Sequence, residues 1–327
     1  MIVAHIYANE KFEPRGYKFV KKLKENNYTV LELLKPKNQS YLRFIITTLI
    51  NLYKSKPDVV HAHRISGFVP AILAKIINPH LKIIFDKHDI HKLDFIFDRL
   101  TRFFADYVIV ASDLHKKRML NFHNNVEVLY NYSWFKKASK REIESARKEF
   151  GVKKEDIVVL FQGSVIKDYG LDLLLHAVKN LSKKIKIVVI GWIKDPIYWE
   201  NCRKIYPDII YLGAKEYEQM YKYISAADIG VVLFKKNKLT EYGNPNKLFE
   251  FFACKVPVIV SDVKSISKYV KNGKNGFVIK NEQELQKAID KLQNRNLRKK
   301  ISKNIPNFKW ENEFKKYLTI LETLHSK

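Results

Sequence analysis

Residues 240–262 place a carboxylate close to an open helix start. Gly243 and Pro245 interrupt regular structure, and the apolar run that follows predicts a helix over residues 247–254. The free N–H groups and positive dipole end of such a helix favour a phosphate. Glu250 can only accept hydrogen bonds, so it suits paired hydroxyls such as those of a ribose. The alternative is a capped core helix with Glu250 pointing into solvent.

A second loop suited to phosphate lies within residues 162–177, between a predicted strand and a predicted helix. Gly163 permits close approach to the backbone, and Lys167 offers a positive charge to a diphosphate. The loop matches neither the Walker motif nor the dinucleotide fingerprint. An ordinary turn with Gly170 at the start of its helix is the alternative.

His88 and Asp89 lie at the end of a predicted strand. A histidine at a strand end can bind a hydroxyl or act as an acid or base. His61, His63 and His91 raise the question of a metal site. Their spacing is common in cores and no further ligand set is evident, so we expect no metal.

Length and composition predict two globular domains with well-filled cores. The chain has 327 residues, 46% of them hydrophobic, where an average domain takes about 150. The formal net charge is +26 and is shared by both halves, which favours an anionic partner such as a nucleotide, nucleic acid, anionic lipid or acidic glycan. Compositional drift toward lysine is the alternative.

The chain lacks the marks of secretion and of membrane spans. Cys202 and Cys254 have no metal-binding spacing, which predicts a reduced compartment. The N-terminus has no basic lead or cleavage site, and the longest lipophilic run, residues 44–53, is about half of a span. We expect a cytoplasmic protein that is soluble or peripheral on the cytoplasmic face of the membrane.

Basic and aromatic side chains share two predicted helices, 17–26 and 41–56. Arg43, Lys54 and Lys56 of the second lie among aromatic and aliphatic residues, a mixture that can hold an anionic membrane. A solvated lysine-rich face over a core stripe is the alternative.

Short apolar strands alternate with helices along the whole chain, which predicts an α/β protein with parallel sheets. The polar residues 136–153 are the best linker, and the pattern restarts after them. Ligands of such sheets bind beyond the carboxyl ends of the strands, here expected between the two halves. The predicted strands are 2–7, 28–34, 58–63, 82–86, 106–111, 126–130, 157–161, 185–190, 209–213, 229–234, 258–260 and 275–279.

The ordered motifs resemble the GT-B glycosyltransferases of family 4. The motifs are Gly16, PDVVHAH at 57–63, His88-Asp89, ADYVIVAS at 105–112, Asn131, Gly163 to GLDLLLHA at 170–177, AADIG at 226–230 and PNKLFEFFACKVPVIVSD at 245–262. The resemblance covers nearly the whole chain, and the last motif is the most specific.

This resemblance implies two Rossmann-like domains facing a central cleft. Residues 1–140 would bind the acceptor, residues 150–305 the nucleotide sugar, and the helix within 306–327 would pack back on the first domain. The implied reaction is a retaining transfer from a UDP- or GDP-sugar, a co-substrate, to a glycan or lipid-linked acceptor in cell-surface polysaccharide or glycolipid synthesis. No cofactor or metal is required.

The resemblance also implies roles for particular residues. Glu250 matches the second Glu of the family's Glu-x7-Glu motif, which holds the ribose. His88, with Asp89 beside it, matches the cleft histidine at the reacting centre. The remaining donor contacts would come from the first loop (Arg15, Gly16), the base-contacting edge (Gly213, Lys215) and the helix start (Asn246, Lys247, Leu248).

Three departures from the family pattern indicate a variant active site. Tyr242 stands where the first Glu is expected, and Ser164 and Tyr169 stand where the phosphate loop has Arg and Lys. Lys167 is a candidate substitute for that lysine. The first loop has a single glycine, Gly16.

Two other functions fit the sequence less well. A sugar-nucleotide epimerase on the same fold would need clustered acids and histidines. A non-catalytic binder of anionic ligands would rely on the net charge. No motif of nucleic-acid recognition is present, so we expect no nucleic-acid partner.

Overall fold

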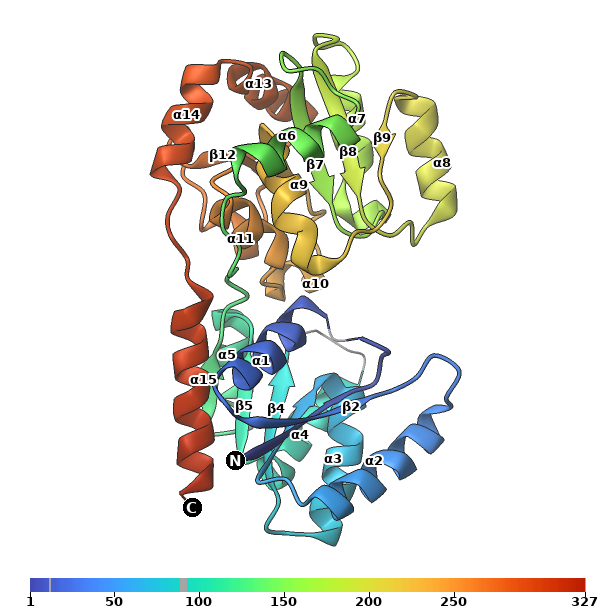
Figure 1. Ribbon diagram of the computed structural model, residues 1–327, viewed down its shortest axis with the longest axis vertical. Helices are drawn as coiled ribbons and strands as arrows, with labels where there is room; N and C mark the ends of the chain where they lie inside the picture. Colours follow the sequence, from blue (N-terminus) through green and yellow to red (C-terminus); the bar gives the residue numbers. More distant parts are fainter. Residues whose placement is uncertain (12, 89–92, 327) are drawn as a thin grey trace. The chain divides into compact units, whose positions relative to one another are not determined.

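The chain folds into two compact α/β units, and the computed structural model describes residues 1–11, 13–88 and 93–326 (Figure 1). Unit 1 comprises Met1–Asn131, Tyr242–Asn244 and Trp310–Lys327. Unit 2 comprises Tyr132–Glu241 and Pro245–Lys309. Each unit is built on one six-stranded, fully parallel sheet, which confirms the expected fold class.

The unit 1 sheet has the strand order β2-β1-β3-β4-β5-β6. Its crossover helices run between consecutive strands, as parallel pairing requires. The strands are β1 Ile2–Tyr7, β2 Thr29–Leu34, β3 Val59–His63, β4 Lys82–Lys87, β5 Tyr107–Val110 and β6 Val126–Val128. The helices are α1 Pro14–Glu25, α2 Tyr41–Ser55, α3 Arg64–Ile77, α4 Asp94–Phe104, α5 Asp113–Met119 and α15 Trp310–His325.

The two faces of this sheet differ because side chains alternate along a strand. Ala4 and Val60 belong to an apolar cluster that also contains Phe44 of α2 and Phe68 of α3. His61, one residue on from Val60, contacts Phe19 of α1 and Tyr317 of α15 instead. One face is therefore apolar and the other carries buried polar groups.

The unit 2 sheet has the strand order β12-β11-β10-β7-β8-β9. Apolar clusters cover both of its faces. The strands are β7 Ile157–Gln162, β8 Ile185–Ile190, β9 Ile210–Tyr211, β10 Ile229–Val232, β11 Val258–Ser261 and β12 Gly276–Ile279. The helices are α6 Lys140–Glu149, α7 Leu171–Val178, α8 Pro196–Ile205, α9 Met220–Ala226, α10 Lys238–Tyr242, α11 Asn246–Ala253, α12 Lys264–Ser267, α13 Glu282–Leu292 and α14 Arg295–Asn304, with 3-10 turns at η1 Lys167–Tyr169 and η2 Tyr217–Gln219.

The expected linker at 136–153 is wrong in part, because α6 occupies most of it. Ser139 and Glu142 form a capping box at its start, and this Ser-x-x-Glu spacing was visible in the sequence. The polar composition concealed the helix, since Ala146 is its one fully buried residue. The sequence pattern also failed to predict α8 and α14.

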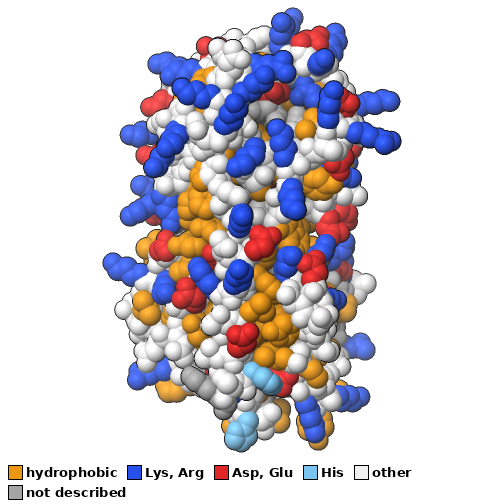
Figure 2. Space-filling model, turned by 60° about the vertical axis from the view of Figure 1, so that its left-hand side comes forward, with side chains coloured by type: hydrophobic (Ala, Val, Ile, Leu, Met, Phe, Trp, Pro, Cys, Tyr) orange, Lys and Arg blue, Asp and Glu red, His pale blue; other side chains and the backbone are white. Residues whose placement is uncertain are grey.

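The distribution of charged side chains and the length and hydrophobicity of the helices indicate which partners the surface can meet. Lys and Arg side chains are spread over the whole face that Figure 2 displays, as the even distribution along the chain indicated. None of the helices in the described part of the chain combines the length and hydrophobicity that crossing a membrane requires.

The first residue of α15 fixes this helix to unit 1. The Trp310 ring is fully buried, lies 5.0 Å from the ring of Phe19 and has the Lys18 ammonium 4.3 Å from its centre. We expect Trp310→Ala to lower the unfolding free energy of unit 1 by about 3–5 kcal/mol, because it leaves a cavity of indole size. Urea denaturation measures the loss. Trp192→Ala, at a ring that is 70% exposed, is the matched control, and an equal effect of both variants would contradict this packing.

Candidate functional site

The helix α11 of unit 2 begins without a side-chain cap. Pro245 is the N-cap, and no side chain caps the helix. Asn246, Lys247 and Leu248 are the first three helical residues. Leu248 is fully buried in the apolar core, so its backbone, and not its side chain, faces any ligand at this end.

Glu250 is buried in α11, which overturns the alternative that it points into solvent. Its side chain is 6% exposed and accepts a hydrogen bond of 3.0 Å from Nε2 of Gln162, the last residue of β7. A hydrogen-bonded carboxylate in this position keeps one defined orientation. No sequence pattern links Gln162 to Glu250, because the two residues are 88 positions apart.

The Lys247 ammonium lies among three aromatic rings. It is 4.3 Å from the ring centre of Tyr169, 5.1 Å from that of Phe234 and 5.5 Å from that of Phe161. No hydrogen bond or ion pair joins it to another described residue. Burial lowers the pKa of Lys247 to about 8, although the charge of Glu250 acts in the opposite direction. The group is a cation without a fixed anionic partner.

The phosphate loop packs against this lysine. Gly163 has φ +110°, and a Cβ there would lie 3.0 Å from Lys247 Nζ, so a side chain would displace the ammonium. Tyr169, which stands where the resemblance expects a lysine, supplies the nearest ring to Lys247. Lys167 is exposed and Ser164 half-buried, so Lys247 is the better-placed cation for an anion held by this loop.

Three glycines bring the ends of β7, β8 and β9 together. The Gly191 N–H donates to the Gly213 carbonyl at 2.9 Å, and a Cβ on Gly191 would lie 1.9 Å from the Gly163 carbonyl oxygen. Lys215 points elsewhere, because its ammonium pairs with Glu149 at 2.7 Å. The edge that was expected to contact the base therefore presents the backbone of Gly213.

In unit 1, Arg15 lies inside the protein. It is 2% exposed and its Nε lies 3.0 and 2.9 Å from the two carboxylate oxygens of Asp86. Its Nη1 donates to the Leu129 carbonyl and to the Asn131 side chain. The guanidinium therefore holds the unit together, and this arrangement leaves it no role as a phosphate ligand. Gly16 is likewise buried within α1.

His88 lies in a charged group that the sequence reading missed. Its Nε2 accepts a hydrogen bond of 3.2 Å from Arg64, which also binds Glu13 at 2.6 Å. Burial alone would raise the pKa of Glu13, but the neighbouring His88 ring and the charge of Arg64 lower it to about 2. Arg64 adopts a left-handed φ of +60°, a costly conformation that recurs at functional sites. Asp89 and His91 lie outside the described residues.

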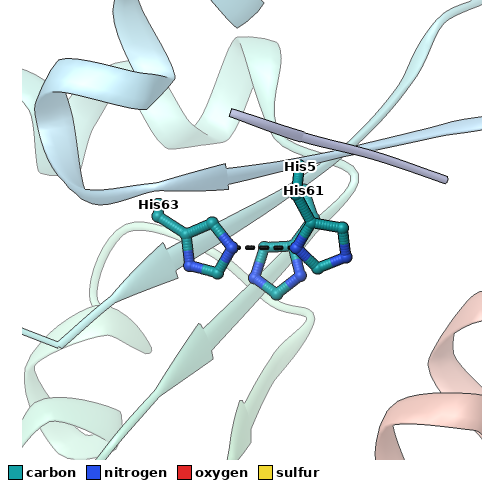
Figure 3. A group of neighbouring side chains, drawn as sticks. All are labelled: His5, His61 and His63. Atoms are coloured by element: carbon teal, nitrogen blue, oxygen red, sulfur yellow. Dashed lines mark hydrogen bonds between the residues drawn. The ribbon is translucent and has the colours of Figure 1, made fainter. Parts of the chain in front are cut away.

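Three buried imidazoles, those of His5, His61 and His63, have ring nitrogens within 4.8 Å of one another (Figure 3). They are the described group with the geometry closest to a metal site. His63 is hydrogen-bonded to His5 at 2.9 Å and lies 3.3 Å from Asp86, while His61 contacts Tyr317 at 2.8 Å. These contacts already occupy both nitrogens of His63, and the Arg15 cation is paired with Asp86 nearby. The cluster fits a hydrogen-bond network better than a cation site.

Tyr242 packs with unit 1. Its carbonyl accepts a hydrogen bond of 2.8 Å from Ser112, and its ring lies 5.0 Å from that of His115. Two residues on, the Asn244 side chain and carbonyl both accept hydrogen bonds from Asn131. Tyr242, which stands where the resemblance expects the first Glu, is therefore an aromatic residue anchored through its backbone.

The sequence model of the glycosyl transferases group 1 matches residues 142–308, about half of the chain. A chitobiosyldiphosphodolichol beta-mannosyltransferase of Candida albicans is 25% identical over 213 residues, which are 59% of this chain and 43% of that protein. An uncharacterized glycosyltransferase of Methanocaldococcus jannaschii is 25% identical over 94% of this chain and 86% of its own length.

The fold matches solved structures over its full length. Anabaena HepE, in a crystal structure with UDP and glucose, gives a TM-score of 0.80 at 15% identity, and the match covers 99% of this chain and 100% of that one. At this identity the likeness concerns the fold.

The buried His115 makes stability depend on pH. It is 1% exposed, neither ring nitrogen has a hydrogen-bond partner among the described residues, and burial, helped by the charge of Lys87, lowers its pKa to about 3. In the unfolded chain the His115 imidazole binds a proton near pH 6.5, whereas in the folded protein it stays neutral until the pH nears 3. His115 therefore contributes stability above pH 6.5 that is lost as the pH falls toward 3.

We expect His115→Leu to lessen the loss of unfolding free energy between pH 6.5 and 4 by about 1.4 kcal/mol per pH unit. Urea denaturation at several pH values measures this slope. His80→Leu, at an exposed histidine, is the control and should leave the slope unchanged. An unaltered slope in the His115 variant would show that this side chain already ionises in the folded state.

Proposed function

The chain belongs to the glycosyl transferases group 1 and has the GT-B fold, and from this premise we propose that it is a retaining glycosyltransferase that uses a UDP- or GDP-sugar. Unit 2 would bind the donor and unit 1 a glycan or lipid-linked acceptor. The observation that carries this proposal is the pairing of a buried carboxylate, Glu250, with an uncapped helix start and the Lys247 cation in one unit.

Unit 2 would offer partners for the ribose, the diphosphate and the base of a nucleotide sugar. The carboxylate of Glu250, oriented by Gln162, would accept hydrogen bonds from the two ribose hydroxyls. The backbone N–H groups at the start of α11 and the Lys247 ammonium would bind the diphosphate. Gly163 allows the backbone to come close to the phosphates, and the backbone at Gly213 would lie beside the base. HepE, which crystallised with UDP-glucose, supports a nucleotide donor.

The reaction requires stabilisation of the departing diphosphate. The bond between the sugar's anomeric carbon and the phosphate oxygen would break, and its electron pair would leave with the nucleoside diphosphate. A bond from that carbon to an acceptor hydroxyl would form on the same face, and the hydroxyl proton would pass to the departing phosphate oxygen. Preorganised N–H groups and a buried cation are effective against charge that develops on a leaving group. Lys247 would supply the cation that Ser164 and Tyr169 lack, so no metal would be needed.

The charged group of unit 1 would handle the sugar and the acceptor. His88 is held by Arg64 and Glu13, so its ring has a fixed orientation. We propose that it contacts the transferred sugar at the reacting centre. The cell-surface glycan or glycolipid that receives the sugar would bind to this unit. The name of the Candida relative includes a dolichol diphosphate, which supports a lipid-linked acceptor.

The test of this function is donor binding and turnover. We expect UDP- or GDP-sugars to raise the melting temperature and to be consumed in the presence of EDTA, with the product retaining the donor's anomeric configuration by NMR. Glu250→Gln should weaken donor affinity about ten- to a hundred-fold, because one strong acceptor is lost. Glu200→Gln, at an exposed carboxylate in unit 2, is the control. No stabilisation by any nucleotide sugar would refute the proposal, and epimerised donor without transfer would favour an epimerase.

The pKa of Lys247 predicts how donor binding responds to pH. Since the ammonium is charged below a pKa of about 8, nucleotide diphosphate affinity should fall up to about ten-fold for each pH unit above 8. Lys247→Met should bind weakly and without this dependence, whereas Lys247→Arg should bind at pH 9 as at pH 7. Lys167→Met, on the exposed side of the same loop, should retain the wild-type profile. Calorimetric titration with UDP measures the affinity, and a flat wild-type profile would exclude Lys247 as the diphosphate ligand.

A further inference from the structure

The helix α2 has apolar side chains on two opposite sides. Phe44 and Leu52 on one side belong to the core of unit 1. Leu42, Ile46, Ile50 and Tyr53 recur every three or four residues on the other side, and they are 68%, 49%, 47% and 77% exposed. A surface helix usually turns a polar side to solvent, so the second apolar stripe calls for a partner.

The stripe continues across a hollow onto α3, which packs beside α2. A cavity of about 600 Å³ between the two helices is lined by Leu49, Ile50, Tyr53, Lys56 and Ile77, among others. Ile76 and Ile77 on the α3 side are 60% and 68% exposed. An open apolar hollow of this size can receive hydrocarbon chains.

The charge around this surface has one sign. Residues 35–56 and 64–82, which contain α2 and α3, carry five and three Lys or Arg and no Asp or Glu. Arg64 and Lys75 pair with acidic residues from elsewhere in the unit. Arg43, Lys54 and Lys56 are exposed and form no ion pair with any described residue.

We propose that the α2–α3 surface, defined by Leu42, Ile46, Ile50, Tyr53, Ile76 and Ile77, docks unit 1 on an anionic lipid bilayer. The apolar side chains enter the acyl region, the hollow takes lipid chains, and Arg43, Lys54 and Lys56 bind the headgroups. Tyr53 has the amphipathic ring favoured at the membrane–water boundary. This inference concerns a surface of unit 1 and does not depend on the donor site of unit 2.

Charge complementarity selects a membrane over a second copy of the chain. A two-fold dimer through this surface would set the same patch against itself. Each copy would then bring Arg43, Lys54 and Lys56 toward the same cations of its partner, with no carboxylate in either α2 or α3 to offset them. An anionic bilayer neutralises these charges and covers the apolar stripe together.

The test is co-sedimentation of the full chain with vesicles of phosphatidylcholine alone or mixed with phosphatidylglycerol. We expect binding to the mixed vesicles that weakens with added salt, and little binding to phosphatidylcholine. Tyr53→Ser/Ile77→Ser should abolish most of the binding, and Lys54→Glu/Lys56→Glu should lower the partition coefficient about ten-fold or more.

Two control variants match these changes in unit 2. Trp192→Ser/Ile197→Ser removes side chains that are 70% and 78% exposed, and Lys183→Glu/Lys184→Glu reverses two exposed lysines. Both should bind vesicles as the wild type does. All four variants should keep the wild-type melting temperature and its increase with nucleotide sugar. A loss of vesicle binding can therefore be distinguished from a loss of donor binding, which would concern the proposed function.

Three outcomes would overturn the proposal. They are no binding of the wild type to anionic vesicles at low salt, equal losses in the unit 1 and unit 2 variants, or a wild-type dimer in light scattering that Tyr53→Ser/Ile77→Ser converts to a monomer.

Discussion

The buried ion pair between Arg15 and Asp86 is the interaction on which the polar side of unit 1 depends. A carboxylate without solvent exposure is costly unless it is paired, and Arg15 donates two hydrogen bonds to Asp86 while the imidazoles of His61 and His63 lie 3.5 and 3.3 Å away. The charge of Arg15 and these neighbouring imidazoles hold the pKa of Asp86 well below its usual range despite burial. The same guanidinium binds Asn131, which in turn holds Asn244 immediately before the N-cap of α11. One buried pair thus orders a strand end, a helix and a distant loop.

Unit 2 is organised by a different constraint, the close approach of backbone at the ends of its central strands. Gly163 and Gly191 meet where no side chain fits, and Lys247 fills the space beside Gly163. The aromatic rings around the ammonium lower its hydration without supplying an anion. Tyr169, which stands where the resemblance expects a lysine, places its ring 4.3 Å from the Lys247 ammonium.

The large positive charge of the chain serves separate purposes in different places. Arg15 and Lys18 are buried structural cations, Lys247 is a partly buried cation that forms no ion pair with a described residue, and Arg43, Lys54 and Lys56 border an apolar surface. Net charge alone could not distinguish these roles, because the energy of a charge depends on burial and on neighbours. Lysine and arginine are spread over the face in Figure 2. Because they gather in no single patch there, composition indicates a broad range of anionic partners.

The sequence by itself determined the two parallel sheets, since apolar strand runs and the breaks between them are local signals, and its motif around Glu250 identified the family. It concealed α6, because a helix that buries one alanine has no apolar period to detect. It assigned Arg15 to the phosphates on motif position, whereas the fold brings Asp86, 71 residues away, to its guanidinium. Gln162 with Glu250, and Arg64 with Glu13 and His88, are likewise pairs that only the tertiary structure decided. The physical reason is that crossover connections, and not sequence distance, set which side chains meet at the ends of parallel strands.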